Sequence, residues 1–262
     1  MIQALGGLMS VTGFPSDEGG HPTKVGVAIS DIATGLFGAI SVLAGLLARN
    51  SERGQEGARG QRIDVSLLGS TLAVLINQAQ NAFVSGQAPI RRGNAHPNII
   101  PYETFRTADG EVAVGVGSER QWRRLCEEIG APELADDPRF ATNGNRVANR
   151  EALRPLLADA IAAELTADWL ERLDRAGIPA GPILDVTDAF ASGAARARRM
   201  RVPMSHPVLG AVDQVGLPFE FARTPASIRT PPPLLGEQTH EILIEAGYSA
   251  EEIGDLRAAG VV

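Results

Sequence analysis

The sequence of 262 residues is 44% hydrophobic and 21% charged, which fits one large or two modest globular domains and excludes a disordered or fibrous protein. A formal net charge of -7 argues against non-specific nucleic-acid binding, because that binding neutralises many phosphates with lysine and arginine. Lys24 is the only lysine, so an anionic ligand must meet a local group of arginines. This arginine preference suits bidentate anion recognition and equally reflects a GC-rich coding bias, which we favour.

Few residues of the types that bind metals or form disulfides are present. Cys126 is the only cysteine, which excludes an internal disulfide framework and a multi-cysteine metal site. The four histidines, His21, His96, His206 and His240, lie in separate segments, so their spacing predicts no metal site. The N-terminal residues MIQALGGLMS lack the basic region of a secretory signal. We expect a cytoplasmic protein with no membrane association and no permanently bound cofactor.

The first ninety residues are predicted to contain three helical segments and one short strand. Met1–Leu8 begins with apolar residues and no capping residue, and it resembles the middle of a helix. Asp31–Arg49 is predicted as a buried helix, because polar residues interrupt the apolar stretch that would otherwise suggest a membrane span. Arg62–Ser66 is predicted as a short strand that feeds a helix over Leu67–Ser85, ended by Gly86. A strand followed by a helix indicates an α/β layer.

Residues 86–101 contain three prolines and two glycines, which predicts an irregular crossing between two structural units. Residues 102–116 then alternate in hydrophobicity and contain Asp109-Gly110, which predicts a β-hairpin with a two-residue turn. Further helices are predicted over Ser118–Ile129, Asn149–Leu165, Thr166–Ala176, Ala191–Met200, Glu237–Ala246 and Ala250–Ala258, with β-like alternation in residues 205–221.

Local motifs alone do not name a reaction. The sequence has no G-x-S-x-G nucleophile motif, and Gly115-Val116-Gly117 lacks the third glycine of a dinucleotide-binding motif. Cys126 lies on a predicted helix and is expected to be a buried structural thiol and not a nucleophile. Asp31 and Asp64 are expected to make structural hydrogen bonds.

Seven blocks carry a family resemblance: QALGGLMSVTG, PTKVGVAISDIATGLFGAISVLAGLLAR, GQRIDVSLL, RRGNAHPNIIPYETFRTADGEVAVGVG, ELADDPRFATNGNRVANR, AGIPAGPILDV and PPPLLGEQTHEIL. In sequence and order they resemble the class III coenzyme A transferases, the family of formyl-CoA transferase and carnitine CoA-transferase, over the whole chain. The resemblance implies a helix-rich α/β fold, with a Rossmann-like large domain, a small α+β domain and two chains interlocked as a homodimer.

The same resemblance implies a division of this chain. Residues 1–88 would end the N-terminal portion of the large domain, and residues 89–101 would form a linker with a glycine-loop segment. Residues 102–205 would form the small α+β domain, and residues 206–262 would return to the large domain. The proline- and glycine-rich crossing at residues 86–101 agrees with this division.

The reaction implied by the resemblance transfers coenzyme A from an acyl-CoA to a free carboxylic acid. An aspartate attacks the thioester to form a mixed anhydride, and the released thiolate then gives an aspartyl-CoA thioester. The family's aspartate follows a tyrosine just ahead of Gln3-Ala4, so its position falls before Met1, and we expect the sequence as given to be inactive alone. Either an internal methionine begins this sequence within a longer gene, which we favour, or the gene is truncated.

The resemblance also points to candidate site residues. A glycine-rich loop that closes over the reacting aspartate aligns with Gly93, Asn94, Ala95, His96, Pro97 and Asn98, although a plain interdomain turn is the alternative. Gln3, Gly6 and Gly7 follow the position of the missing aspartate. They would line the acyl pocket, or they would only permit tight helix packing. Arg91 and Arg92 would contact an acyl or CoA anion, or carry exposed, solvated charge, which we favour.

Two other functions stay open. An α-methylacyl-CoA racemase shares this fold and works by proton transfer, and Glu119 falls near the family's racemase glutamate. The loop GNAHPNIIPY is more similar to transferases, and its HPNIIPY form is similar to relatives that handle short dicarboxylates such as succinate and glutarate. The other alternative is a non-catalytic partner subunit or remnant.

Overall fold

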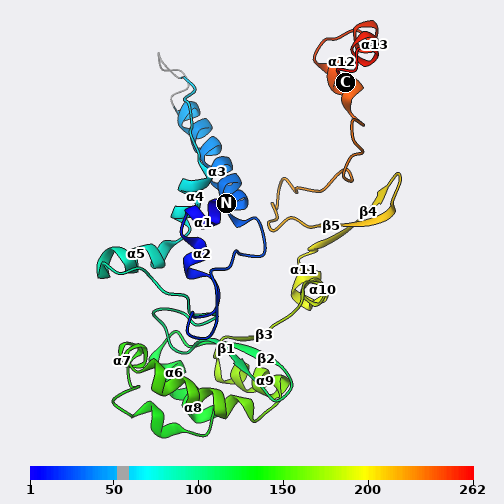
Figure 1. The fold of residues 1–262 in the computed structure, drawn as a ribbon. Helices are drawn as coiled ribbons and strands as arrows, with labels where there is room; N and C mark the ends of the chain where they lie inside the picture. Colours follow the sequence, from blue (N-terminus) through cyan, green and yellow to red (C-terminus); the bar gives the residue numbers. More distant parts are fainter. Residues whose placement is uncertain (52–58) are drawn as a thin grey trace. The chain divides into compact units, whose positions relative to one another are not determined.

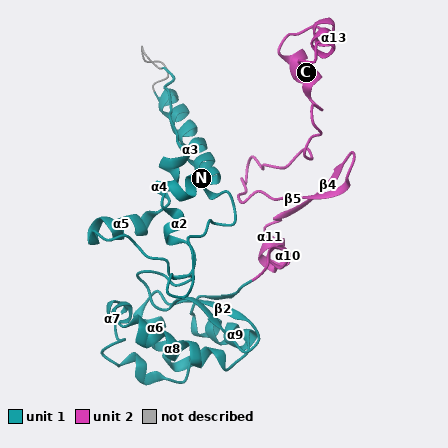
Figure 2. Ribbon diagram, viewed as in Figure 1, with its two compact units in different colours: residues 1–183 teal, residues 184–262 magenta. Residues whose placement is uncertain are grey.

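The computed structural model describes residues 1–51 and 59–262, which fall into two compact units (Figures 1 and 2). Unit 1 is Met1–Ile183 and unit 2 is Leu184–Val262. The described chain is a helix-rich mixture of helices and antiparallel strands.

Unit 1 begins with five helices: α1 (Ile2–Leu5), α2 (Leu8–Val11), α3 (Ile29–Ser51), α4 (Leu67–Ala73) and α5 (Ile76–Ser85). Gly7 lies between α1 and α2 with φ 77°, a left-handed conformation that favours glycine, so the chain does not begin as the one helix that we expected. Gly86 ends α5 in the same conformation, which confirms the predicted helix stop.

The predicted strand at residues 62–66 is wrong. These residues form no strand, and Ser66 instead caps α4 by accepting a hydrogen bond from the Gly69 amide. Alternation alone does not make a strand, because a strand needs a neighbour to pair with. The predicted helix over residues 67–85 is two helices, α4 and α5, which meet at Val74 and Leu75.

Helix α3 exists as predicted, but the expectation that it is buried is wrong. Only Ser30 and Ala33 are buried along its length, while apolar residues such as Leu36 and Leu43 are about two-thirds exposed. Among the described residues it is the one helix long and apolar enough, by length and composition, to cross a membrane. Helix α4 packs on one side of α3, where Thr71 donates a hydrogen bond to Ser30 Oγ at 2.8 Å. Ile63 also lies beside α3, since a Cβ on Gly45 would be 3.0 Å from its Cδ1, but most other apolar side chains of α3 are exposed in the described chain.

The core of unit 1 lies between a three-stranded sheet and a set of helices (Figure 1). Strands β1 (Tyr102–Arg106), β2 (Glu111–Gly115) and β3 (Ala180–Pro182) pair antiparallel in the order β1-β2-β3. The helices are α6 (Glu119–Glu128), α7 (Asn143–Ala148), α8 (Arg150–Ala162) and α9 (Thr166–Ala176), with a 3-10 helix at Pro132–Ala135. The buried apolar side chains include Phe105, Val112, Val114, Trp122, Leu125, Phe140, Leu153, Leu157 and Trp169.

Most predicted elements of this core are confirmed. Ser118 caps α6, and Gly177 ends α9 in a left-handed conformation at the predicted residue. The hairpin is confirmed, but the predicted two-residue turn is wrong, since residues 107–110 all lie between the assigned strands. The Asp109 carboxylate accepts hydrogen bonds from the amide and hydroxyl of Thr166, both at 2.8 Å, and so fastens the hairpin end to α9.

Unit 2 contains α10 (Val186–Ala191), α11 (Gly193–Ala197), the hairpin β4 (Arg201–His206) with β5 (Gly210–Val215), α12 (Thr239–Glu245) and α13 (Ala250–Ala258). The last two helices follow the prediction. Of the β-like alternation predicted over residues 205–221, β5 is confirmed, whereas most of β4 precedes that range and residues 216–221 form no strand. The predicted basic helix at residues 191–200 is present but shorter, as α11 over Gly193–Ala197, because Ser192 ends α10 and caps α11. All strand pairs in the described ranges are antiparallel, so the Rossmann-like parallel sheet stays a prediction. The predicted domain boundaries also stay predictions.

Candidate functional site

The segment Gly93–Asn98, which we call the 93–98 loop, is part of the connection between α5 and β1. Gly93 has φ 59°, and its amide donates a hydrogen bond to Gly13 O at 3.0 Å. A Cβ at this position would lie 3.0 Å from Phe14 Cδ1. Glycine is therefore favoured here by both its backbone angle and its close neighbour.

Two hydrogen bonds and one ring contact join the loop to strand β1. The Asn94 side chain donates a hydrogen bond to Thr104 Oγ1 at 2.8 Å, and the His96 amide donates to Tyr102 O at 2.9 Å. The His96 ring lies edge-on to the Tyr102 ring, with centroids 5.4 Å apart. The 93–98 loop is thus an ordered segment with several fixed partners.

The surroundings of His96 favour the neutral form of its imidazole. Its Nδ1 accepts a hydrogen bond from the Asn98 amide at 3.1 Å. Burial, followed by the positive charge of Arg150, lowers the pKa of His96 below its ordinary value of 6.5. The lowered pKa favours the neutral ring, in which Nδ1 serves as an acceptor.

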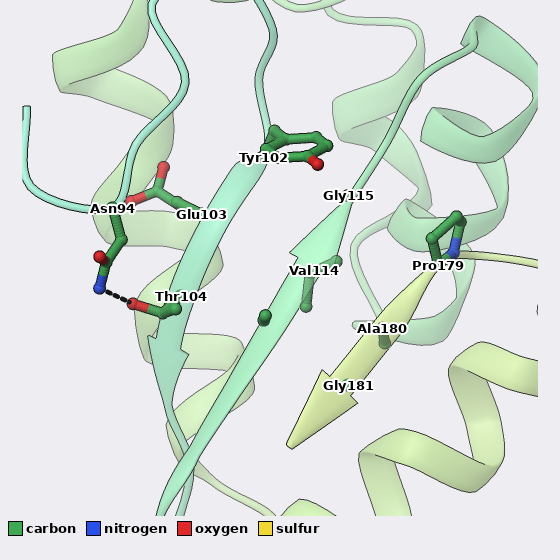
Figure 3. Close-up of a pocket in the computed structure, with 10 residues that line it drawn as sticks. Asn94, Tyr102, Glu103, Thr104, Val114, Gly115, Pro179, Ala180 and Gly181 are labelled. Atoms are coloured by element: carbon green, nitrogen blue, oxygen red, sulfur yellow. Dashed lines mark hydrogen bonds between the residues drawn. The ribbon is translucent and has the colours of Figure 1, made fainter. Parts of the chain in front are cut away.

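A pocket of about 420 Å³ lies beside the loop, along β1, β2 and β3 (Figure 3). Its walls are mostly apolar or backbone, and they consist of Asn94, Tyr102, Glu103, Thr104, Ala113, Val114, Gly115, Pro179, Ala180 and Gly181. In Figure 3 the Asn94 amide points toward Thr104 at one side of this pocket. The buried Glu103 carboxylate is engaged, because Arg154 donates to it at 2.6 Å. The pocket therefore suits the uncharged part of a small-molecule ligand, with a polar group of that ligand placed near the 93–98 loop.

The three residues that the sequence resemblance offered as lining an acyl pocket all have structural partners. Gln3 accepts from the Val25 amide at 2.9 Å and donates to Val27 O at 3.3 Å. A Cβ on Gly6 would lie 2.6 Å from Thr71 Cγ2, so this glycine lets α1 approach α4. Together with the left-handed backbone at Gly7, these contacts favour the packing interpretation over an acyl pocket.

The two adjacent arginines differ. Arg91 donates from Nε to Phe14 O at 3.1 Å and from Nη2 to Gly20 O at 3.3 Å and to the Ser16 hydroxyl. It fastens the turn at residues 14–20 and is not the solvated charge that we expected. Arg92 is half-buried and makes no hydrogen bond or ion pair within the described residues. Burial, and then the charge of Arg92, lower the pKa of Arg150.

Glu119 is held in an ion pair with a buried arginine. Its Oε2 accepts a hydrogen bond from Arg146 Nη1 at 2.7 Å, and its Oε1 accepts one from the main-chain N–H of Asn143 at 2.8 Å. Burial raises the pKa of Glu119, but hydrogen bonds from Arg146 and Asn143 and the charge of Arg146 lower it by more, so the net shift is downward. An ionised carboxylate with both oxygens engaged is poorly suited to the proton transfer of a racemase.

The remaining sequence-based candidates have no catalytic setting. Cys126 is buried, as predicted, and burial raises the pKa of its thiol to about 12. Asp64 pairs with Arg62 at 2.8 Å in an exposed position. Asp31 is exposed and makes no side-chain hydrogen bond within residues 1–51 and 59–262, so its predicted structural role is wrong. The same residues contain no group of three metal-binding side chains.

Sequence reasoning missed three side chains that contact the 93–98 loop or its exit: Asn143, Arg146 and Arg150. The signal that could have found them is their spacing of three and then four residues within NGNRVANR, which places polar groups along one side of a helical stretch.

Comparisons with known proteins agree with this architecture. The sequence profile of CoA-transferase family III matches residues 1–239. The chain is 38% identical to the succinate–glutarate CoA-transferase of Agrobacterium fabrum over 245 residues, which are 94% of this chain and 59% of that protein. It is 36% identical to the succinyl-CoA:glutarate CoA-transferase of Homo sapiens over 263 residues, which are 100% of this chain and 58% of that protein.

A solved structure shows the same fold. The crystal structure of a CAIB/BAIF family protein from Brucella suis matches with a TM-score of 0.73 and 39% identity, over 94% of this chain and 61% of that chain. The chain therefore spans about three fifths of the length of the relatives that it matches. With a profile match over most of its length and relatives above one-third identity, this chain belongs to CoA-transferase family III.

Proposed function

We propose that this chain is part of an enzyme that transfers coenzyme A between an acyl-CoA and a free carboxylic acid. The observation that carries the proposal is the match of residues 1–239 to CoA-transferase family III. The names of the relatives from Agrobacterium fabrum and Homo sapiens both describe CoA transfer involving glutarate.

The proposed chemistry proceeds through a carboxylate nucleophile. An aspartate attacks the acyl-CoA thioester, which releases the CoA thiolate and leaves a mixed anhydride. The thiolate then attacks the aspartyl carbonyl, giving an aspartyl-CoA thioester and the free acid. The acceptor carboxylate attacks that thioester to form a second anhydride, and the thiolate leaves and returns to the acceptor's acyl carbon. We place the aspartate in the part of the relatives' length that this chain does not span.

Within this chain, the 93–98 loop is the proposed cover of the reacting groups. Its support is the left-handed Gly93, the His96 ring whose pKa is lowered by burial, and the amide of Asn94 at the side of an apolar pocket. Each proposed intermediate would also react with water, so such a cover favours transfer over hydrolysis. The neighbouring pocket would hold the uncharged part of the acyl group or of the CoA arm.

We propose short dicarboxylates, such as succinate and glutarate, as the acids. The support is the pair of relatives whose names include glutarate, together with the HPNIIPY form of the loop. A cytoplasmic homodimer without a resident cofactor completes the proposal. Activity confined to monocarboxylates would contradict the dicarboxylate part of it.

The experiment that tests the function compares two samples. The native protein is purified from its source, its intact mass is measured, and succinyl-CoA with labelled glutarate is used to follow transfer of CoA. Purified 1–262 protein is assayed alongside. We expect transfer by the native protein, a mass above that of 1–262, and no transfer by 1–262 alone. Transfer by 1–262 alone would disprove the placement of the nucleophile.

The same samples test the alternatives. Exchange of deuterium into the carbon beside the thioester, without CoA transfer, would replace the proposal by a racemase. Inactive native protein that purifies with a longer relative would replace it by a partner subunit.

A further inference from the structure

We propose that Asn143 and Arg150 are positioning residues that fix the path of the 93–98 loop, and that Glu119 and Arg146 hold them in place. The inference rests on the proposed function, because the loop acts there as the cover of the reacting groups. All four residues lie in unit 1, and their contacts to the loop and its exit go to main-chain atoms.

Arg150 holds the middle of the loop. Its Nη2 donates to His96 O and to Pro97 O, both at 3.0 Å, across 54 and 53 residues of sequence. The residue is only 8% exposed, so water does not readily replace these bonds. A charged donor shared by two successive carbonyls fixes the direction of the chain at that point.

Asn143 holds the end of the loop. Its Nδ2 donates to Asn98 O at 2.8 Å, while its Oδ1 accepts from the Ile100 amide at 3.2 Å. One amide side chain thus satisfies a donor and an acceptor two residues apart. Aspartate has the same shape but no donor, so it could keep only the bond to Ile100.

Glu119 and Arg146 support this arrangement from behind. Glu119 Oε1 accepts a hydrogen bond from the main-chain N–H of Asn143 at 2.8 Å and so fixes the start of α7. Arg146 Nε donates to Ile100 O at 2.7 Å, and its Nη1 donates to Glu119 Oε2 at 2.7 Å. The main chain leaving the loop is therefore held at Asn98 O and at both polar atoms of Ile100.

This geometry makes a specific functional prediction. If the loop keeps water from the reacting groups, loosening it must raise hydrolysis relative to transfer. A variant that merely lowers the folded fraction reduces both rates equally and leaves their ratio unchanged. The ratio of transfer to hydrolysis therefore separates positioning from general stability.

The experiment uses the native protein and its Asn143→Asp and Arg150→Gln variants, with succinyl-CoA and glutarate. Amide hydrogen exchange of residues 93–100 is measured on the same samples. Asn145→Asp is the matched control for Asn143, because Asn145 lies on the same helix and donates to Pro138 O at 2.7 Å, away from the loop. Arg124→Gln is the control for Arg150, because Arg124 donates to Ala176 O at 2.7 Å.

We expect each loop variant to speed exchange in residues 93–100 about tenfold and to lower the transfer-to-hydrolysis ratio about tenfold, as the loss of one or two buried hydrogen bonds implies. Arg150→Lys, which keeps the charge, should recover part of the ratio. Both controls should keep the wild-type ratio and exchange.

The outcomes separate the two proposals. Unchanged exchange at residues 93–100 in both loop variants would disprove the positioning role. Faster exchange with an unchanged ratio would disprove its role in excluding water. Faster exchange in a native protein that transfers no CoA would leave the positioning contacts supported and the proposed function refuted.

Discussion

Replacing Arg146 by methionine tests how strongly the loop support contributes to the stability of unit 1. Methionine keeps much of the side-chain volume against the Trp122 ring but removes every donor. Two buried carbonyls, Ile100 O and Phe140 O, lose their partner, at about 1–3 kcal/mol each. The Glu119 side chain is 52% exposed, so water can solvate it, and it adds at most about 1 kcal/mol. We expect the free energy of unfolding to fall by about 4 kcal/mol.

The assay is urea unfolding followed by tryptophan fluorescence. The only two tryptophans, Trp122 and Trp169, are both buried in the core of unit 1, so the signal reports on this unit. Arg123→Met is the control, because Arg123 pairs with Asp136 on the surface and should lose less than about 1 kcal/mol. A loss below about 1 kcal/mol for Arg146→Met, or one equal to the control, would refute this reasoning.

Three further predictions concern single positions. Gly6→Ala places a Cβ 2.6 Å from Thr71 Cγ2 and should destabilise the protein by about 1–3 kcal/mol in urea unfolding; no loss would contradict the tight packing. Cys126, with a pKa of about 12, should resist iodoacetamide at pH 8 in the folded protein and react in urea, as read by mass spectrometry; fast labelling of folded protein would show that the thiol is accessible. The His96 pKa measured by NMR should lie below 6.5. Because the unfolded state then binds more protons, the free energy of unfolding should fall as pH drops through about 6.5, and His96→Gln should reduce this fall; a measured pKa above 6.5 would reverse its sign.

The elements predicted best from sequence are those whose ends are set by local chemistry. Helix α9 occupies Thr166–Ala176 as predicted, because Gly177 adopts the left-handed conformation that ends a helix. Ser118 caps α6 through a hydrogen bond from the Gln121 amide, three residues away. Such signals lie within one helical turn of the boundary and need no knowledge of the rest of the fold.

The features that sequence reasoning missed depend on distant partners. The contacts of Asn143 with Ile100 and of Arg150 with His96 join residues 43 and 54 positions apart. The unpaired segment at residues 62–66 has the alternation of a strand but no neighbouring strand in the described chain. Glu119 was a candidate base by alignment alone, and only its pairing with Arg146 shows that its carboxylate is engaged.

Helix α3 has a consequence for how this chain tolerates change. Side chains such as Ile40, Leu43 and Leu47 are each more than 60% exposed and add little to the core of unit 1. Polar replacements there would therefore cost the unit's own folding free energy little, in contrast to replacements at buried positions such as Leu153. The core of unit 1 therefore does not explain why α3 is so apolar.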